Sequence, residues 1–124
     1  MRSLLFVCAV YLSAAQFSPS DVMILGDIDY GQTSSALDCP GEPKYCALVF
    51  NASGGDKVQV TVTGGTGKAY IALADGTLKE LSSGSDKLVF ALPASQEPVT
   101  YYAIFRDQGG KAGKFTVDLR KLPD

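Results

Sequence analysis

The sequence predicts an all-β protein, a single antiparallel β-sandwich domain of about seven to nine strands. Short apolar runs recur at intervals of about 8–12 residues, and several of them alternate between apolar and polar side chains as a half-buried strand does. Many of the 13 glycines and 6 prolines lie between these runs, where turns are expected. No stretch combines helical periodicity with helix-capping residues.

Residues 1–15 have the pattern of a secretory signal peptide. A positive residue near the start is followed by a short apolar run and by small residues at 13–15, and the run is too short to span a bilayer. A lipoprotein signal built on Cys8 is disfavoured, because large residues precede that cysteine. We therefore predict cleavage before Gln16, secretion to the extracellular space or the periplasm, and one folded domain at 16–124.

The clearest strand is predicted at 57–63. Three valines share one face there and polar residues occupy the other, which is the period of two that a strand with one buried face requires. Gly26 is expected to bend an earlier strand that begins at Val22. The predicted strands are, in order, 22–25, 45–51, 57–63, 69–74, 77–81, 87–92, 99–106 and 114–119, with an extended piece near Ala36.

Two turns are expected to connect neighbouring strands as β-hairpins. The run at 99–106, a Gly-rich loop and the alternating run at 114–119 predict a hairpin in the last third of the chain. The pair Asp75 and Gly76 predicts a two-residue hairpin turn, which leads into a short polar edge strand at 77–81.

The inward-facing residues of these strands are expected to form one hydrophobic core, because apolar burial supplies most of the stability of a domain of this size. The predicted core residues are Val58, Val60, Val62, Ile71, Leu73, Leu88, Phe90, Phe105, Phe115, Val117 and Leu119.

Two cysteines remain after the predicted cleavage, Cys39 and Cys46. In an oxidising compartment two cysteines in one small domain pair most simply with each other, and Pro40 and Pro43 between them favour a turn that brings them together. We predict a local disulfide that contributes about 2–3 kcal/mol and fastens the entering loop to the strand at 45–51. An intermolecular bond and free thiols are the alternatives.

Several short motifs resemble those of bacterial pre-peptidase C-terminal domains. They are Tyr-Gly-Gln-Thr at 30–33, Gly-Asp-Lys-Val at 55–58, Asp-Gly-Thr-Leu at 75–78, Tyr-Tyr-Ala-Ile-Phe at 101–105 and Gly-Lys-Phe-Thr-Val at 113–117. The resemblance extends over most of the predicted domain and implies a compact antiparallel sandwich of jelly-roll type. Such domains usually follow the catalytic domain of secreted hydrolases, and some bind calcium, collagen or polysaccharide.

Three aspartates are candidate calcium ligands. Asp27 and Asp29 share a face of an extended segment, and Asp56 lies in a predicted turn, while calcium takes about six to eight oxygen ligands. The further acidic residues of a calcium loop are missing, so the competing interpretation is ordinary turn chemistry. Apart from this candidate calcium, the sequence predicts no cofactor.

Tyr70 and Tyr102 are candidate ligand-facing aromatic residues. Both lie on the strand face opposite the predicted core, where tyrosine rings can stack on a sugar or a peptide. The competing interpretation is that both rings are half-buried and have a structural role.

The composition argues against an enzyme and against nucleic-acid binding. No histidine is present, so a nucleophile paired with histidine cannot form. The formal net charge is only −2, with the two signs interspersed, whereas nucleic-acid binding calls for a clustered basic face. The Gly-Gly-Thr-Gly-Lys run at 64–68 resembles a phosphate loop only superficially. Ala69 stands where that motif needs Ser or Thr, and a strand rather than a helix is predicted to follow.

These observations predict a small secreted binding or accessory module without catalytic activity, which recognises a protein or polysaccharide surface. The alternative is a structural subunit that assembles with itself or with other chains through sheet edges, since edges offer unpaired N–H and C=O groups. The candidate edges are the strands at 22–25 and 77–81. No membrane span is predicted beyond the signal peptide.

Overall fold

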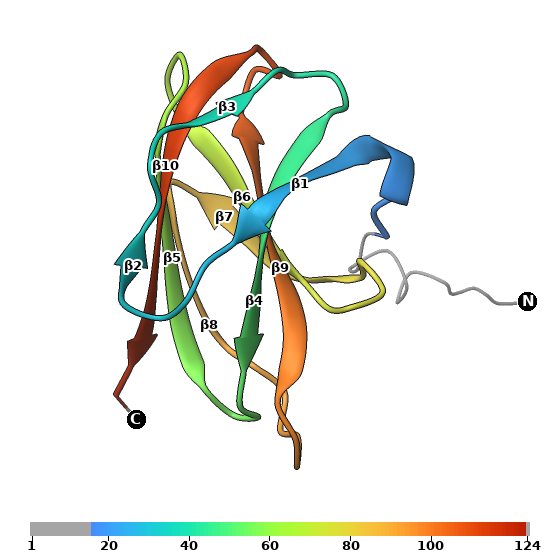
Figure 1. The fold of residues 1–124 in the computed structure, drawn as a ribbon, viewed down its shortest axis with the longest axis vertical. Helices are drawn as coiled ribbons and strands as arrows, with labels where there is room; N and C mark the ends of the chain where they lie inside the picture. The colour runs from blue at the N-terminus through green and yellow to red at the C-terminus, as the bar shows by residue number, and fades with distance from the viewer. Residues whose placement is uncertain (1–15, 124) are drawn as a thin grey trace, which may run out of the picture.

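Two β-sheets pack face to face in the computed structural model, which describes residues 16–123 (Figure 1). The predicted signal peptide at 1–15 lies outside the described residues. Within them the one helical element is a 3-10 turn, η2 (Pro19–Asp21), and no helix there is long and apolar enough to cross a membrane. The all-β sandwich prediction is confirmed.

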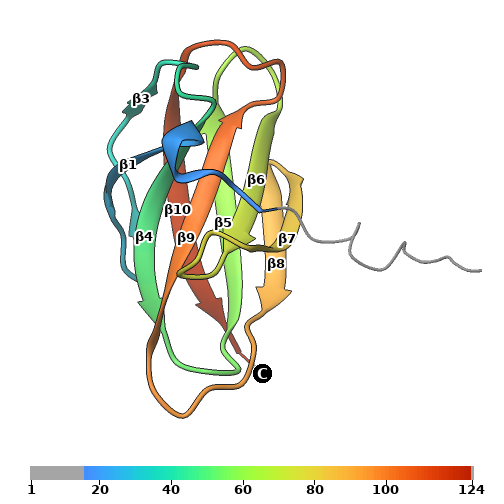
Figure 2. The same cartoon turned by 90° about the vertical axis from the view of Figure 1, so that its right-hand side faces the viewer.

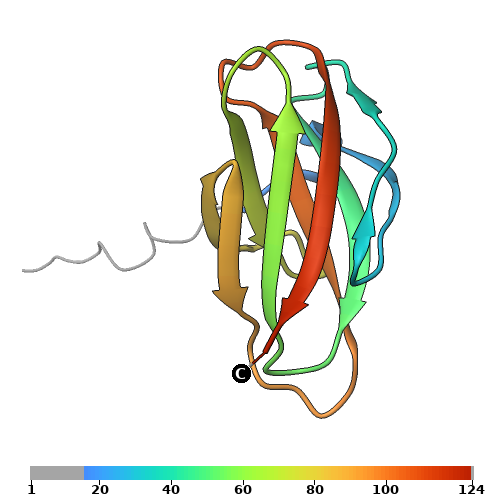
Figure 3. The same cartoon turned by 90° about the vertical axis from the view of Figure 1, so that its left-hand side faces the viewer.

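Five strands form the first sheet, in the order β1–β4–β9–β6–β7. Their bounds are β1 (Val22–Asp27), β4 (Tyr45–Ala52), β9 (Val99–Asp107), β6 (Ala69–Ala74) and β7 (Glu80–Ser85). The second sheet has the order β2–β10–β5–β8, and β3 also pairs with β10 (Figure 3). Its strands are β2 (Gln32–Thr33), β3 (Leu37–Cys39), β5 (Lys57–Gly64), β8 (Lys87–Ala91) and β10 (Gly113–Leu122). The described chain thus has ten strands, more than predicted, because the segment 32–39 supplies two very short ones along β10.

One strand pair departs from the antiparallel prediction. β1 runs parallel to β4, whereas the other named strand pairs of the described chain are antiparallel. The two strands are joined through β2 and β3 of the second sheet rather than by a hairpin, so a parallel arrangement is open to them. The register shifts between Ile24 and Gly26, and Gly26 has a φ of 154°, so the predicted bend is confirmed.

The hairpin predicted for the last third of the chain is wrong. β9 pairs with β4 and β6, while β10 pairs with β2, β3 and β5, so the two strands lie in different sheets (Figure 2). Their apolar faces meet across the core, where the ring centroids of Phe105 and Phe115 are 5.5 Å apart. Facing strands bury both apolar surfaces against each other, which adjacent strands of one sheet do not do. The Gly-rich loop at 108–112 therefore crosses between the sheets.

The hairpin predicted at Asp75 and Gly76 is correct in pairing and wrong in length. β6 and β7 are antiparallel neighbours, and β7 is a sheet edge, but β7 begins only at Glu80. Leu78 adopts a positive φ of 65° and is buried. The loop is longer than two residues because it folds this leucine back over the sheet.

The main hydrophobic core lies between the two sheets, and all of its predicted members except Phe90 are buried. Phe90 is half-buried and packs against the side of the core, because its strand β8 is an edge of the second sheet. Phe50 and Tyr101, on neighbouring strands, add a further ring pair with centroids 5.8 Å apart.

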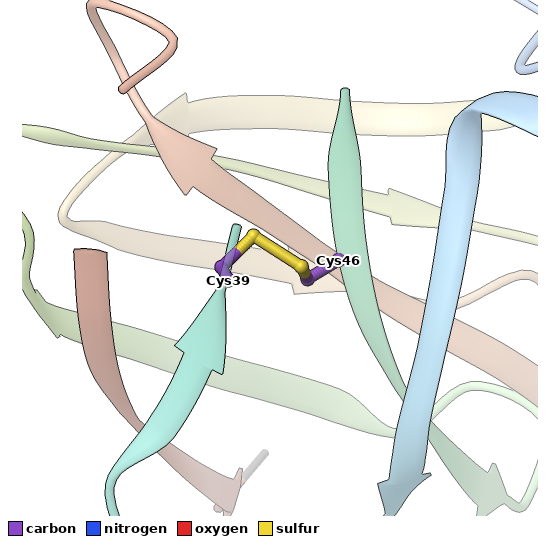
Figure 4. Close-up of a disulfide and its surroundings, with 2 residues drawn as sticks. All are labelled: Cys39 and Cys46. Atoms are coloured by element: carbon purple, nitrogen blue, oxygen red, sulfur yellow. A yellow bond between two sulfur atoms is a disulfide. The ribbon is translucent and has the colours of Figure 1, made fainter. Parts of the chain in front are cut away.

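Cys39 and Cys46 form the predicted disulfide, with Cα atoms 6.0 Å apart (Figure 4). Cys39 ends β3, which pairs with β10, and Cys46 lies in β4. The bond therefore connects the two sheets and is not only a local loop closure as predicted. Both cysteines are buried.

Candidate functional site

The outer face of the first sheet, β1–β4–β9–β6–β7, points away from the main core and carries a second apolar cluster. Ala47, Ala72, Ala74 and Ile104 are fully buried in it. Because three of these four side chains are single methyl groups, another segment of the chain can lie close to the sheet surface.

Residues 16–21, which we call the N-terminal strap, cover this outer cluster together with the β6–β7 loop (Figure 2). Phe17 donates its backbone N–H to the carbonyl oxygen of Leu78 at 3.0 Å, and both side chains are buried. The Phe17 ring meets the Tyr45 ring edge to face, with centroids 5.1 Å apart. The strap therefore shields one end of a row of polar and aromatic residues on the same face.

Tyr45, Arg106 and Tyr70 form this row across three neighbouring strands. Tyr45 opens β4, Arg106 precedes the last residue of β9, and the strand register places Arg106 directly opposite Tyr70 of β6. The guanidinium carbon of Arg106 lies 4.9 Å from the centroid of the Tyr45 ring and 5.8 Å from that of Tyr70. The two rings also contact each other, with centroids 6.0 Å apart. Both attract the cation through their electron-rich faces, so the guanidinium packs against the pair of rings.

The charge of Arg106 has no anionic partner among the described residues. Its Nε is buried without a hydrogen-bond acceptor, and none of the ion pairs formed within 16–123 involves it. Arg120, by contrast, donates from Nε to the Asp118 carboxylate at 2.8 Å. The two arginines of the described chain thus differ in whether their charge is compensated.

Tyr70 is hydrogen-bonded to the carboxylate of Glu80. Its hydroxyl donates to Oε1 of Glu80 at 3.3 Å. Burial first, and then the negative charge of Glu80, raise the pKa of Tyr70 to about 12, so the hydroxyl remains protonated at neutral pH. Glu80 is therefore engaged by the tyrosine and forms no ion pair with Arg106.

The two tyrosines predicted to face a ligand are not brought together. Tyr70 lies opposite Arg106 and Tyr102 lies opposite Ala74, near the other end of β6. Tyr102 is half-buried against the outer cluster. The expected strand face is correct, whereas a ligand-facing role for either ring stays a prediction. The sequence analysis did not single out Tyr45 among the candidate aromatic residues and missed Arg106, although the alternation of β9 places Arg106 on the face of Tyr102.

Three loops converge at one end of the sandwich, the top of Figure 1, and we call them the three-loop end. They are the β3–β4 loop at 40–44, the β5–β6 loop at 65–68 and the β9–β10 loop at 108–112. A side chain at Gly41 would come within 3.2 Å of the Gly110 carbonyl oxygen. The first and third loops therefore lie close together at Gly41, where the close approach and a φ of 82° both favour glycine.

Asp107, the neighbour of Arg106, connects two of these loops from the inner side of the sheet. Its Oδ1 accepts hydrogen bonds from the Thr66 N–H at 2.9 Å and the Thr66 hydroxyl at 2.8 Å. Its Oδ2 accepts from the Gly109 N–H at 2.9 Å and from the Lys111 N–H at 3.4 Å. The bonds from Thr66, and then those from Lys111 and Gly109, hold the pKa of Asp107 below its ordinary value of 3.8. A satisfied carboxylate of this kind fixes the loops relative to each other.

Basic side chains and a shallow hollow mark the surface of the three-loop end. Lys44, Lys68 and Lys111 are exposed there. A hollow of about 410 Å³ lies beside the disulfide, between the end of β3 and the start of β10. Lys114 pairs with Asp38 at 3.1 Å along this hollow. This end thus offers defined shape and positive charge to a partner.

The three candidate calcium ligands are not gathered into one group. Among residues 16–123 no three His, Cys, Asp or Glu side chains are placed to hold a metal ion. Asp27 and Asp29 are exposed, while Asp56 accepts a hydrogen bond from the Tyr30 hydroxyl at 2.9 Å and lies 3.6 Å from the Lys121 ammonium. Calcium binding at these residues stays a prediction.

Comparison with known proteins identifies similar structures but no similar sequence. No protein-family model matches the chain, and no curated protein matches it. The pre-peptidase C-terminal domain of a Bacillus anthracis collagenase is similar with a TM-score of 0.55 at 15% identity, over 85% of this chain and 100% of that one. PliG of Aeromonas hydrophila, a periplasmic inhibitor of g-type lysozyme, is similar with a TM-score of 0.54 at 13% identity, over 80% of this chain and 99% of that one. The fold implied by the motif resemblance is confirmed.

Proposed function

We propose that this chain is a small secreted module without catalytic activity, and that it recognises the surface of a partner protein through the three-loop end. The observation that carries the proposal is the buried Asp107 carboxylate, which bonds to loops 65–68 and 108–112 at once. Loops held in one conformation lose less conformational entropy on binding than mobile loops do.

The charge of this end favours a partner surface that carries acidic groups. Lys44, Lys68 and Lys111 are exposed there, although the whole chain has a net charge of −2. The exposed Glu42 of loop 40–44 offsets one of these charges. The remaining excess of positive charge steers this end toward a negative surface.

The similar structures support a protein partner rather than a polysaccharide. One of them is an inhibitor of a lysozyme, so in that protein a similar sandwich acts on an enzyme. The other belongs to a collagenase. The disulfide between Cys39 and Cys46 supports secretion, because such bonds persist mainly in oxidising compartments.

Affinity capture from the extracellular or periplasmic fraction of the producing cells tests the proposal. The captured protein is identified by mass spectrometry, purified and titrated against variants of this chain. Lys68→Glu and Lys111→Glu are each expected to weaken binding about tenfold or more. The matched control is Lys57→Glu, an exposed lysine at the opposite end of the sandwich, which is expected to leave the affinity unchanged.

Two results would overturn the proposal. If Lys57→Glu weakens binding as much as the loop variants do, then the three-loop end is not the binding surface. If a glycan array gives a specific ligand while no protein is captured, then the chain is a polysaccharide-binding module.

A structural subunit is the second candidate function, and the sheet edges support it. β1 and β7 are the two edge strands of the first sheet, and Ile24 of β1 is 48% exposed. An exposed apolar edge strand can pair with a strand of another chain. Light scattering over a wide concentration range tests this candidate: Ile24→Lys is expected to dissociate an assembly, whereas a strict monomer at every concentration rejects it.

A further inference from the structure

The guanidinium of Arg106 is a donor group without an acceptor. Its Nε is buried and unpaired, and its two terminal nitrogens are neither buried nor bonded to any acceptor in residues 16–123. Leaving a partly buried charge unpaired is costly, and arginines in such places are usually matched to a carboxylate. Because the buried Nε is closed to an outside ligand, it is the two terminal nitrogens that point to an anion from outside the described chain.

The two tyrosines restrict the position of this guanidinium and leave it able to bind a planar anion. Tyr45 and Tyr70 approach it at 4.9 and 5.8 Å from ring centroid to guanidinium carbon. Stacking restricts the rotamers of the long side chain, and it leaves the N–H groups at the edge of the plane free to donate. Two parallel N–H groups match the two oxygens of a carboxylate.

The position of the row connects it to the three-loop end. Tyr45 follows the loop at 40–44, Tyr70 lies just after the loop at 65–68, and Arg106 lies just before the loop at 108–112. A protein seated on the three loops would therefore extend over this row. Glu80, the carboxylate bonded to Tyr70, forms no ion pair with Arg106 and leaves the position open.

We infer that Arg106, packed against Tyr45 and Tyr70, binds a carboxylate supplied by an acidic side chain or a chain terminus of the partner protein. The inference rests on the proposed function for the source of the carboxylate, while the oxyanion site itself follows from the row alone. Arg106 acts here as a binding residue, and the two tyrosines act as positioning residues.

An NMR titration tests the site without any partner. The processed, ¹⁵N-labelled protein is titrated with sodium acetate at constant ionic strength, with sodium chloride as the reference salt, and the Arg106 Nε–H resonance is followed. Acetate is expected to give a saturable shift with a dissociation constant on the order of tens of millimolar. Shifts equal to those in chloride overturn the site.

Matched variants separate this site from general charge effects. Arg106→Gln is expected to abolish the saturable acetate shifts of neighbouring backbone amides, and Arg106→Lys is expected to weaken them because an ammonium offers no planar pair of donors. Arg120→Gln, which removes the arginine already paired with Asp118, is expected to retain them. If Arg106→Gln does not fold, the Arg106→Lys and Tyr70→Ala variants carry the test, and undiminished acetate binding in both overturns the inference.

A second measurement identifies the source of the carboxylate. A polyglutamate peptide and polygalacturonate, which present carboxylates on a protein and on a polysaccharide, are compared on the wild type and on Arg106→Gln. Tighter, Arg106-dependent binding of the peptide supports a protein source, and the reverse preference overturns it.

If acetate binds but no protein partner is captured, the proposed function fails and the oxyanion site stands. If a partner is captured at the three-loop end but Arg106→Gln leaves its affinity unchanged, only the inference about Arg106 fails.

Discussion

Both faces of the first sheet, β1–β4–β9–β6–β7, carry buried side chains, but the two faces are covered in different ways. The inner face meets a complete second sheet through large side chains such as Phe50 and Phe105. The outer face carries small side chains such as Ala47 and Ala72, and a short strap with Phe17 and a loop with Leu78 cover it. The inner face therefore packs against several strands of the second sheet, whereas a few side chains of the strap and the β6–β7 loop cover the outer face.

The same contrast holds for two consecutive residues of β9. Asp107 points inward and its carboxylate accepts four hydrogen bonds. Arg106 points outward and its Nε has no acceptor in the described chain. A charge whose donors or acceptors are filled from within stabilises the structure, while an unfilled charge is available to a partner. The contrast leaves the inward-facing charge satisfied within the fold and the outward-facing charge without an anionic partner among the described residues.

The largest effect is expected from an inner-face substitution. Phe105 is fully buried in the main core, so Phe105→Ala should lower the free energy of unfolding by about 3–5 kcal/mol. Urea unfolding followed by circular dichroism measures the change. Thr63→Val, at an exposed position of β5, keeps a β-branched side chain; it is the control and should change the free energy of unfolding by less than about 0.5 kcal/mol. Equal losses for the two variants would contradict the assignment of the core.

A smaller effect is expected from the outer face. Phe17→Ala removes the main ring of the strap and should cost about 2–4 kcal/mol, because the strap can relax toward the sheet more easily than a core strand can. The exposed Ser18→Ala, also in the strap, is the control. A loss as large as that of Phe105→Ala would show that the two faces are equally important, and no loss would show that the strap does not stabilise the sheet.

The disulfide tests how firmly the two sheets are joined on the inner side. Reduction, or joint replacement of Cys39 and Cys46 by Ala, should cost about 2–3 kcal/mol, since the closed loop is short. The sandwich should stay folded, because the buried side chains between the sheets remain. Thermal melts with and without reductant measure the difference, and complete unfolding at room temperature on reduction would contradict the prediction.

The smallest effect on the whole domain is expected from acid. Hydrogen bonds hold the pKa of Asp107 in the folded state below its ordinary value of 3.8. The stability that its charged form contributes is therefore fully present above the pKa of the unfolded state. This stability is lost as the pH falls through the lower pKa of the folded state. The amide resonances of Thr66 and Gly109 should therefore shift in acid before the core unfolds. Asp107→Asn should remove this titration, whereas the exposed Asp38→Asn should leave it unchanged.

Sequence periodicity was informative wherever one face of a strand is buried. The valines of β5 and the alternation of β10 predicted both strands and their core faces, because a period of two leaves only one choice of inner face. The resemblance to pre-peptidase C-terminal domains also predicted the fold. Periodicity did not reveal which strands pair, and the apparent hairpin of β9 and β10 failed because a glycine loop can also connect two sheets.

The candidate site was harder to predict than the fold. Tyr70 was placed on the correct face, but its neighbours Tyr45 and Arg106 come from strands that are distant in the sequence and adjacent only in the sheet. The three aspartates looked similar in the sequence, yet Asp56 is engaged by Tyr30 while Asp27 and Asp29 are exposed.

The sequence by itself determined most of the strands, all of the predicted core residues except Phe90, and the sandwich fold, and it favoured the pairing of Cys39 with Cys46. These features follow from the spacing of apolar residues, the positions of glycine and proline, and the count of cysteines, all of which are local. Only the tertiary structure decided that the disulfide joins two sheets, that Asp107 bonds to two loops, and that Arg106 packs against two tyrosines without an anionic partner in the described chain. The physical reason is that hydrogen-bond and charge partners are selected by distance in space, and strand order in the sheets sets that distance.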